Sequence, residues 1–62
     1  MTEQDARQLK VNDWVMWDDN PDDIGRVFQV EIGGVCIYWD DGYVGWIAYR
    51  DCTVLTKVND EV

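Results

Sequence analysis

The chain of 62 residues has no histidine, a single proline and only two cysteines. Without histidine it offers neither a Ser-His-Asp nor a Cys-His catalytic group, and it lacks the usual nitrogen ligand of zinc. Cys36 and Cys52 are too few for a Cys₄ metal site or for the dense disulfide framework of a small secreted domain. We therefore expect two free thiols, with a disulfide as the alternative, and no metal, no cofactor and no enzymatic activity.

Basic side chains are also scarce, because five Lys and Arg face thirteen Asp and Glu, for a formal net charge of −8. This charge opposes direct binding to nucleic-acid phosphates and to anionic membranes. It would steer a cationic partner towards the protein, although acidity also serves to keep a small aromatic protein soluble. No apolar run is long enough to cross a bilayer, and the polar N-terminus does not resemble a signal peptide. We expect a cytoplasmic protein.

Aromatic residues are abundant, with four Trp, three Tyr and one Phe. A domain of this size buries only about 60% of the surface that its unfolded chain exposes. Each aromatic side chain can bury on the order of 150–250 Å². Large rings therefore compensate for a small core, and some of them remain available for recognition.

The residue pattern divides the chain into an N-terminal arm (1–10), a β domain (11–57) and a C-terminal tail (58–62). We expect the arm to be loose, with at most one helical turn. The acidic stretch 18–23 is expected to be a loop, because its proline favours a turn and its carboxylates cannot be buried. Gly33-Gly34 and Asp41-Gly42 each predict a two-residue hairpin turn. The expected strands are 11–17, 24–32, 35–40, 43–48 and 52–57.

These two turns predict a register for the middle strands. Val30 would pair with Ile37, and Tyr38 with Gly45, and side chains alternate between the two faces. One face is then wholly apolar and is the expected core: Phe28, Val30, Ile32, Val35, Ile37, Trp39, Val44, Trp46 and Ala48. The other face is unusually apolar for a solvated surface, since it would carry Tyr38, Tyr43, Ile47 and Tyr49.

The sequence resembles the small SH3-like barrels, and among them Tudor-type and Mib-type domains. The motifs that carry this resemblance are Asp13-Trp14-Val15, Gly25-Arg26-Val27, Val35-Cys36-Ile37-Tyr38-Trp39-Asp40-Asp41-Gly42, Tyr49-Arg50 and Val54-Leu55. They cover about residues 11–56. The resemblance implies an all-β, five-stranded SH3-like (Tudor-like) barrel with a short flexible N-terminal arm. It is specific for fold and weak for function, because this barrel hosts many unrelated activities.

Tudor-type domains hold a methylated Lys or Arg in a cage of aromatic rings. The resemblance places such a cage at Trp17, at Tyr38 or Trp39, and at Tyr43. Ring faces attract a cation by about 0.5–2 kcal/mol, and the neighbouring Asp40 and Asp41 would add to the attraction.

Three functions agree with these patterns. The first is a non-catalytic interaction module that docks a basic or cation-bearing protein or peptide on an aromatic and acidic surface. The second is a small acidic inhibitor that mimics nucleic acid, as phages and mobile elements encode. The third is an accessory subunit of a larger complex or of a homo-oligomer. The acidic stretches flank the aromatic hairpin, which favours docking, and the expected partner-binding residues are Trp17, Tyr38, Asp40, Asp41, Tyr43, Ile47 and Tyr49.

Overall fold

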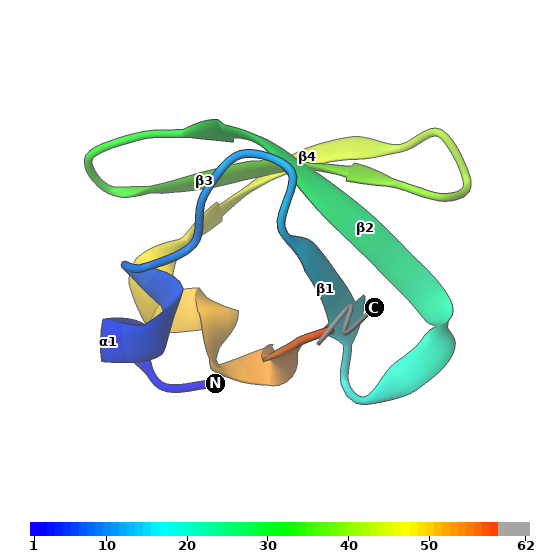
Figure 1. The fold of residues 1–62 in the computed structure, drawn as a ribbon, viewed down its shortest axis with the longest axis horizontal. Coiled ribbons are helices and arrows are strands. Elements are labelled where there is room, and N and C mark those ends of the chain that lie inside the picture. The colour runs from blue at the N-terminus through cyan, green and yellow to red at the C-terminus, as the bar shows by residue number, and fades with distance from the viewer. Residues whose placement is uncertain (59–62) are drawn as a thin grey trace.

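A computed structural model describes residues 1–58 and shows a mostly β domain (Figure 1). Its elements are α1 (Glu3–Ala6), β1 (Trp14–Trp17), β2 (Asn20–Val30), β3 (Gly34–Trp39), β4 (Val44–Ala48), the 3₁₀ helix η1 (Tyr49–Val54) and β5 (Leu55–Lys57). The strands form one five-stranded antiparallel sheet in the order β4-β3-β2-β1-β5. The expected five-stranded β domain is thus confirmed. Within residues 1–58 the edge strands β4 and β5 do not pair, so the sheet is open and the expected closure into a barrel is not seen.

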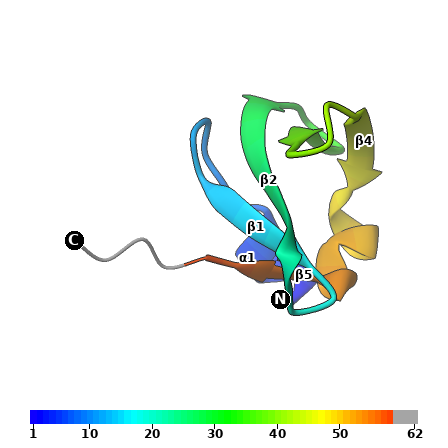
Figure 2. The same cartoon turned by 90° about the vertical axis from the view of Figure 1, so that its right-hand side faces the viewer.

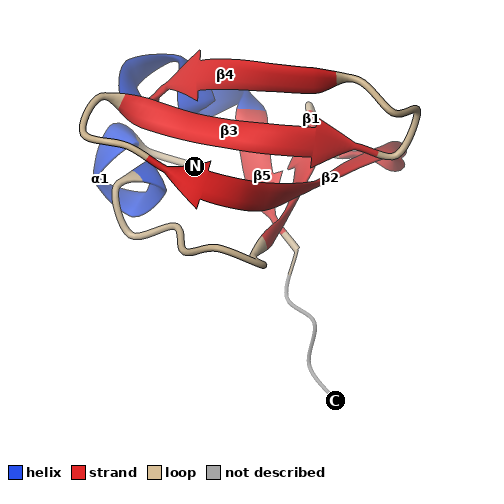
Figure 3. Ribbon diagram, turned by 90° about the horizontal axis from the view of Figure 1, so that it is seen from above, coloured by secondary structure: helices blue, strands red, loops and turns tan. Residues whose placement is uncertain are grey.

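The sheet is strongly bent, and its concave side holds the core. Figure 3 shows β4, β3 and β2 side by side, while Figures 1 and 2 show β1 and β5 turning beneath them next to the two helices. The fully or nearly fully buried side chains come from both helices, from every strand except β4 and from the segment after α1: Ala6, Leu9, Val15, Val27, Val35, Ile37, Tyr49, Cys52 and Leu55. No helix among residues 1–58 is long and apolar enough to cross a membrane.

The N-terminal arm is part of this core, so the expectation of a loose arm is wrong. Ala6 is the last residue of α1, and Leu9 follows in the turn after it, where its amide donates a 3.1 Å hydrogen bond to the Ala6 carbonyl. Both side chains are buried. Met1 packs against the same cluster, and its amino group donates a 2.6 Å hydrogen bond to the carbonyl oxygen of Leu55. The arm covers one end of the small β core. Residues 59–62 of the predicted tail are outside the described residues.

The first hairpin turn is displaced by one residue from its expected position. The Glu31 amide donates to the Gly34 carbonyl at 2.9 Å, so Ile32 and Gly33 form the turn. Val30 therefore pairs with Val35 and not with Ile37. Gly34 is the first residue of β3, and a Cβ there would lie only 2.7 Å from Cζ2 of the Trp46 ring. A glycine is therefore needed here because the Trp46 ring packs closely against the backbone, and not because the position forms the turn.

A bulge at Phe28 then changes the face that β2 presents to the core. It lies between Val27 and Gln29, and it brings Val27 opposite Ile37. Val27 is fully buried as a result. Phe28, Val30 and Ile32, which we expected in the core, are instead 39%, 41% and 96% exposed, and Ile32 lies in the turn. The extra residue of a bulge reverses the alternation of side chains on one strand only, and the sequence pattern does not reveal it.

The second hairpin turn is one residue longer than expected. Trp39 and Tyr43 close it through a 2.8 Å bond from the Trp39 amide to the Tyr43 carbonyl, which leaves Asp40, Asp41 and Gly42 in the loop. Gly42 has a φ of 89°, so the expected positive φ is confirmed. The added residue shifts β4 by one position, and such a shift exchanges the two faces of a strand.

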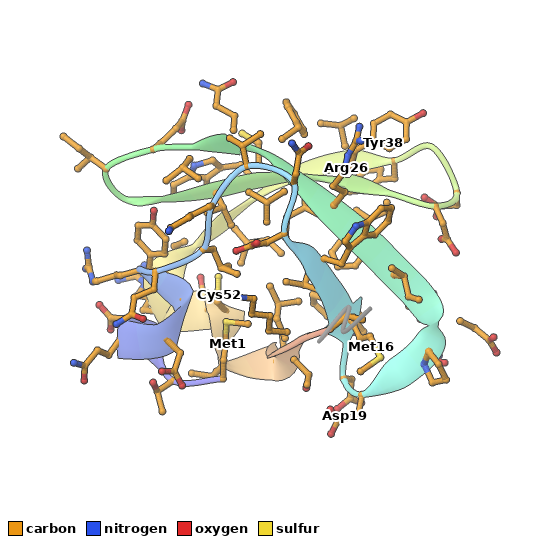
Figure 4. All side chains as sticks on the ribbon, in the orientation of Figure 1. Met1, Met16, Asp19, Arg26, Tyr38 and Cys52 are labelled. Carbon is orange, nitrogen blue, oxygen red and sulfur yellow. The ribbon has the colours of Figure 1, made fainter. Side chains whose placement is uncertain are left out.

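The shift in β4 overturns the predicted face assignment. Ile47 pairs with Val35 on the concave side, whereas Val44 and Trp46, expected in the core, are on the convex side and are about half exposed. Tyr38 is on the convex side as well, next to Arg26, and Figure 4 shows both on the opposite side of the sheet from Cys52. The predicted tyrosine face therefore does not exist as one surface.

The acidic stretch 18–23 is mostly strand. Only Asp18 and Asp19 form the turn, both with positive φ, and β2 already begins at Asn20. The carboxylates remain exposed even so, because this part of β2 extends beyond the core. The prediction of a loop over all six positions is wrong, whereas the expected exposure is confirmed.

Candidate functional site

One end of the concave side contains a pocket with a volume of about 350 Å³, within the range of small-ligand sites. The end of β1, the start of β2, the β3–β4 hairpin and β4 itself all contribute to it. Its lining residues are Trp17, Asp23, Trp39, Asp40, Asp41, Tyr43, Gly45, Trp46 and Ile47. The pocket therefore combines aromatic rings with three carboxylates, those of Asp23, Asp40 and Asp41, which we call its acidic rim.

The aromatic walls meet at defined angles. The rings of Trp17 and Trp39 are 6.2 Å apart between centroids and are inclined at 80°, an edge-to-face arrangement. A Cβ at Gly45 would lie 3.1 Å from Cε2 of Tyr43 and 3.9 Å from Nε1 of Trp39. Gly45 thus leaves open a space between these two rings that any other residue would narrow.

The β3–β4 loop holds the acidic and aromatic groups of the rim in a fixed relation. Oδ1 of Asp41 accepts a 2.9 Å hydrogen bond from the Tyr43 amide, an Asx-type turn. The Gly42 amide donates to the Trp39 carbonyl at 2.9 Å. These bonds form within the loop itself, so they hold Asp41 and Tyr43 in the hairpin that Trp39 and Tyr43 close without requiring contacts from the rest of the protein.

The carboxylates of Asp23, Asp40 and Asp41 give the pocket its charge. The ion pairs of the described residues 1–58 join Arg7 to Glu3 and Lys57 to Asp13, so neither neutralises a pocket carboxylate. Asn20 donates a 3.1 Å hydrogen bond to Asp23 and carries no charge. The pocket therefore presents uncompensated negative charge beside ring faces, which is an environment that attracts a cation.

Most of the residues that the sequence predicted to bind a partner line this pocket. Trp17, Asp40, Asp41, Tyr43 and Ile47 do so. Of the two candidates for the middle cage position, Tyr38 or Trp39, only Trp39 lines it.

Tyr38 and Tyr49 are elsewhere. Tyr38 is on the convex face, half exposed, and Tyr49 is in the core, where its hydroxyl donates a 2.8 Å hydrogen bond to the Glu31 carbonyl. The structure thus gives Tyr49 a packing role that the sequence pattern did not indicate, and leaves Tyr38 exposed but apart from the pocket.

Sequence reasoning missed Asp23, Gly45 and Trp46 as pocket residues. The pattern predicts a solvated loop for Asp23. The pairing of β2 with β3 brings it to the pocket, since its neighbour Ile24 accepts a 3.0 Å bond from the Asp40 amide. Gly45 and Trp46 were placed on the wrong faces by the one-residue shift of β4. The Trp46 ring lies over Gly34 on the convex side, and Trp46 borders the pocket from the edge strand β4.

The remaining reactive groups do not form a second site. Within residues 1–58, no group of three or more His, Cys, Asp or Glu is arranged to hold a metal ion. Both thiols are free. Burial, and to a smaller extent the charge of Asp51, raise the pKa of the Cys52 thiol above its ordinary value. Cys52 is therefore a protonated, packed core residue and not a reactive nucleophile.

No protein-family model matches this sequence, and neither a curated protein nor a solved structure gives a match.

Proposed function

We propose that this protein is a non-catalytic, SH3-like interaction module whose pocket binds a cationic side chain of a basic protein or peptide. The observation that carries the proposal is the meeting of Trp17, Trp39 and Tyr43 with unpaired carboxylates in a single pocket. The strand order, and the short helix between β4 and β5, agree with the resemblance to Tudor-type and Mib-type domains. The cation would be a lysine or arginine side chain, with or without methyl groups.

Two effects would contribute to binding. A cation over an aromatic face gains about 0.5–2 kcal/mol, and more when water is excluded. The net charge of −8 would increase the rate of encounter with a basic partner. Since the pocket is open to solvent, salt should slow association while changing the aromatic contacts little.

The proposal can be tested with small cations that represent the two side chains. Methylguanidinium and tetramethylammonium would be titrated into the protein, with tert-butanol as a neutral probe of similar shape to tetramethylammonium. Tryptophan fluorescence and the NMR signals of the Trp17 and Trp39 indoles report on occupancy. We expect saturable changes with either cation and none with tert-butanol. Equal responses to all three probes would show an apolar pocket without preference for charge.

A pair of charge-matched variants tests whether the rim carboxylates act locally. Asp40→Asn removes a pocket carboxylate, whereas Asp22→Asn makes the same change in net charge outside the pocket. Loss of a nearby charge should weaken cation binding by about 1 kcal/mol, or several-fold, in Asp40→Asn. Binding to Asp22→Asn should stay close to that of the parent. Equal losses in both variants would assign the effect to overall acidity and would favour the inhibitor that mimics nucleic acid.

A further inference from the structure

We infer that the partner is an extended peptide segment that adds to the sheet as an antiparallel strand along β4 and places a basic side chain in the pocket. This inference rests on the proposed function of the pocket. It adds the conformation of the partner, its position on the sheet and the pattern of its side chains.

The first observation is that β4 is an edge strand. It pairs with β3 on one side, and no strand within residues 1–58 pairs with it on the other. Its residues Val44 and Trp46 are exposed at 49% and 52% and carry no charge. Edge strands that are neither charged nor covered are templates for a further strand.

The second observation is the register, which identifies the free backbone groups. The Trp39 amide bonds to the Tyr43 carbonyl at 2.8 Å, and the Tyr49 amide bonds to the Gly33 carbonyl at 3.1 Å. Because hydrogen-bonded positions alternate along an antiparallel pair, Gly45 and Ile47 also direct their backbone groups towards β3. The backbone amide and carbonyl groups of the alternate residues, Val44, Trp46 and Ala48, therefore point to the open edge.

The third observation is that the pocket reaches this edge, since Gly45, Trp46 and Ile47 all line it. Gly45 is a concave-side position of β4. In an added strand, the side chain of the residue opposite Gly45 would therefore project to the concave side and into the pocket. Its two neighbours would project to the convex side, against Val44 and Trp46. The fitting segment therefore has one basic residue flanked on both sides by apolar residues.

The charges favour a basic segment over a second copy of this chain. In a dimer formed through two β4 edges, each pocket would face the sequence Val44-Gly45-Trp46-Ile47-Ala48, which has no cation to offer. Each copy also carries a net charge of −8. The antiparallel direction follows the other pairs of the sheet and gives the slightly more stable ladder.

The probe is the peptide acetyl-Thr-Ser-Val-Arg-Val-Ser-Thr-amide, and its control has citrulline in place of arginine. Amide hydrogen exchange measured by NMR would follow each backbone position of β4. On binding, we expect slower exchange at Trp46 and Val44, by about tenfold or more at saturation, since each amide gains a hydrogen bond. Gly45 and Ile47 are internal controls, because β3 already protects their amides. The citrulline peptide should give little protection.

Backbone methylation of the peptide tests the register directly. In the antiparallel arrangement the arginine amide points away from β4, while the amide of the following valine bonds to it. Methylating the valine nitrogen should reduce affinity by about tenfold, and methylating the arginine nitrogen should change it little. The reverse result would overturn the antiparallel register.

Ala48→Pro provides a variant of the protein for the same purpose. Ala48 has a φ of −65° and a ψ of 147°, which suit proline. The Ala48 amide points to the open edge, so its loss should leave the pairing of β4 with β3 intact. This variant should bind the peptide more weakly and methylguanidinium as the parent does.

The outcomes separate this inference from the proposed function. Occupancy of the pocket by peptide or methylguanidinium without protection of Trp46 would overturn strand addition and leave cation binding intact. Equal protection by the citrulline peptide would support an edge site and contradict the cationic pocket. Protection that grows with protein concentration in the absence of peptide would assign the edge to a second copy. No response to any probe would overturn both proposals.

Discussion

Both faces of the β2-β3-β4 sheet carry apolar side chains, but these side chains differ in how far they are covered. On the concave face Val35 and Ile37 are fully buried, because η1, α1 and β5 lie across them. On the convex face Tyr38 and Trp46 are 50% and 52% exposed, because no segment of residues 1–58 covers them. Hydrophobicity therefore selects candidates for the core, while coverage by other segments determines which of these side chains form it.

The largest effect is expected where the covered face is weakened. Ile37→Ala should reduce the free energy of unfolding by about 2–5 kcal/mol, because it removes a fully buried side chain and leaves a cavity. Tyr38→Ala, its neighbour on the convex face, should cost less than about 1 kcal/mol. Urea denaturation of both variants measures the difference. Similar losses would mean that the convex face is also covered in solution.

A smaller effect is expected at the turn that decides which face of β4 points inward. Gly42→Val should destabilise the domain by about 1–2 kcal/mol, because a β-branched residue resists a φ of 89°. No atom lies within 4 Å of the position of an added Cβ, so the cost would come from the backbone alone. Gly42→Asn is the control and should cost less, since Asn tolerates this conformation. Unchanged thermal melting of Gly42→Val would contradict this turn.

Binding should distinguish the tyrosines of the two surfaces. Tyr43→Ala should weaken methylguanidinium binding by about 1 kcal/mol, because Tyr43 lines the pocket. Tyr38→Ala, on the convex face, should bind as the parent does. Titrations followed by tryptophan fluorescence measure both. Weaker binding in Tyr38→Ala alone would place the cation site on the convex face.

The smallest effect is expected for alkylation of the two thiols, which should differ in rate. Cys36 is partly exposed on the convex face, whereas Cys52 is buried with a raised pKa. Iodoacetamide at neutral pH should modify Cys36 first, because the thiolate is the reacting form and burial disfavours it at Cys52. Mass spectrometry of the native protein measures the order, and both thiols should react in urea. Early modification of Cys52 would show that η1 opens readily.

Local signals identified the elements of this fold well. Alternating apolar residues located the middle strands, and Asp41-Gly42 located a turn whose glycine does have positive φ. Aromatic and acidic residues that flank this turn converge on the pocket. These features could be predicted because each depends on neighbours along the chain, through turn geometry and side-chain alternation.

The assignment of faces could not be predicted in the same way. The bulge at Phe28 and the one-residue extension of the β3–β4 loop each exchange the two faces of a strand. The pattern of apolar residues does not reveal either exchange, because both faces carry many apolar side chains. The packing of Leu9 and Tyr49 into the core depends on contacts between segments far apart in the chain.

Composition and short-range pattern are sufficient to predict a mostly β domain with a strand-rich middle, its acidity and its supply of aromatic rings. Contacts between segments far apart in the chain are needed to place Trp39 in the pocket instead of Tyr38, to bring Asp23 to it from β2, and to leave β4 at an edge that no strand of residues 1–58 pairs with. The physical reason is register: side chains alternate with a period of two residues, so a displacement of one residue exchanges core and surface.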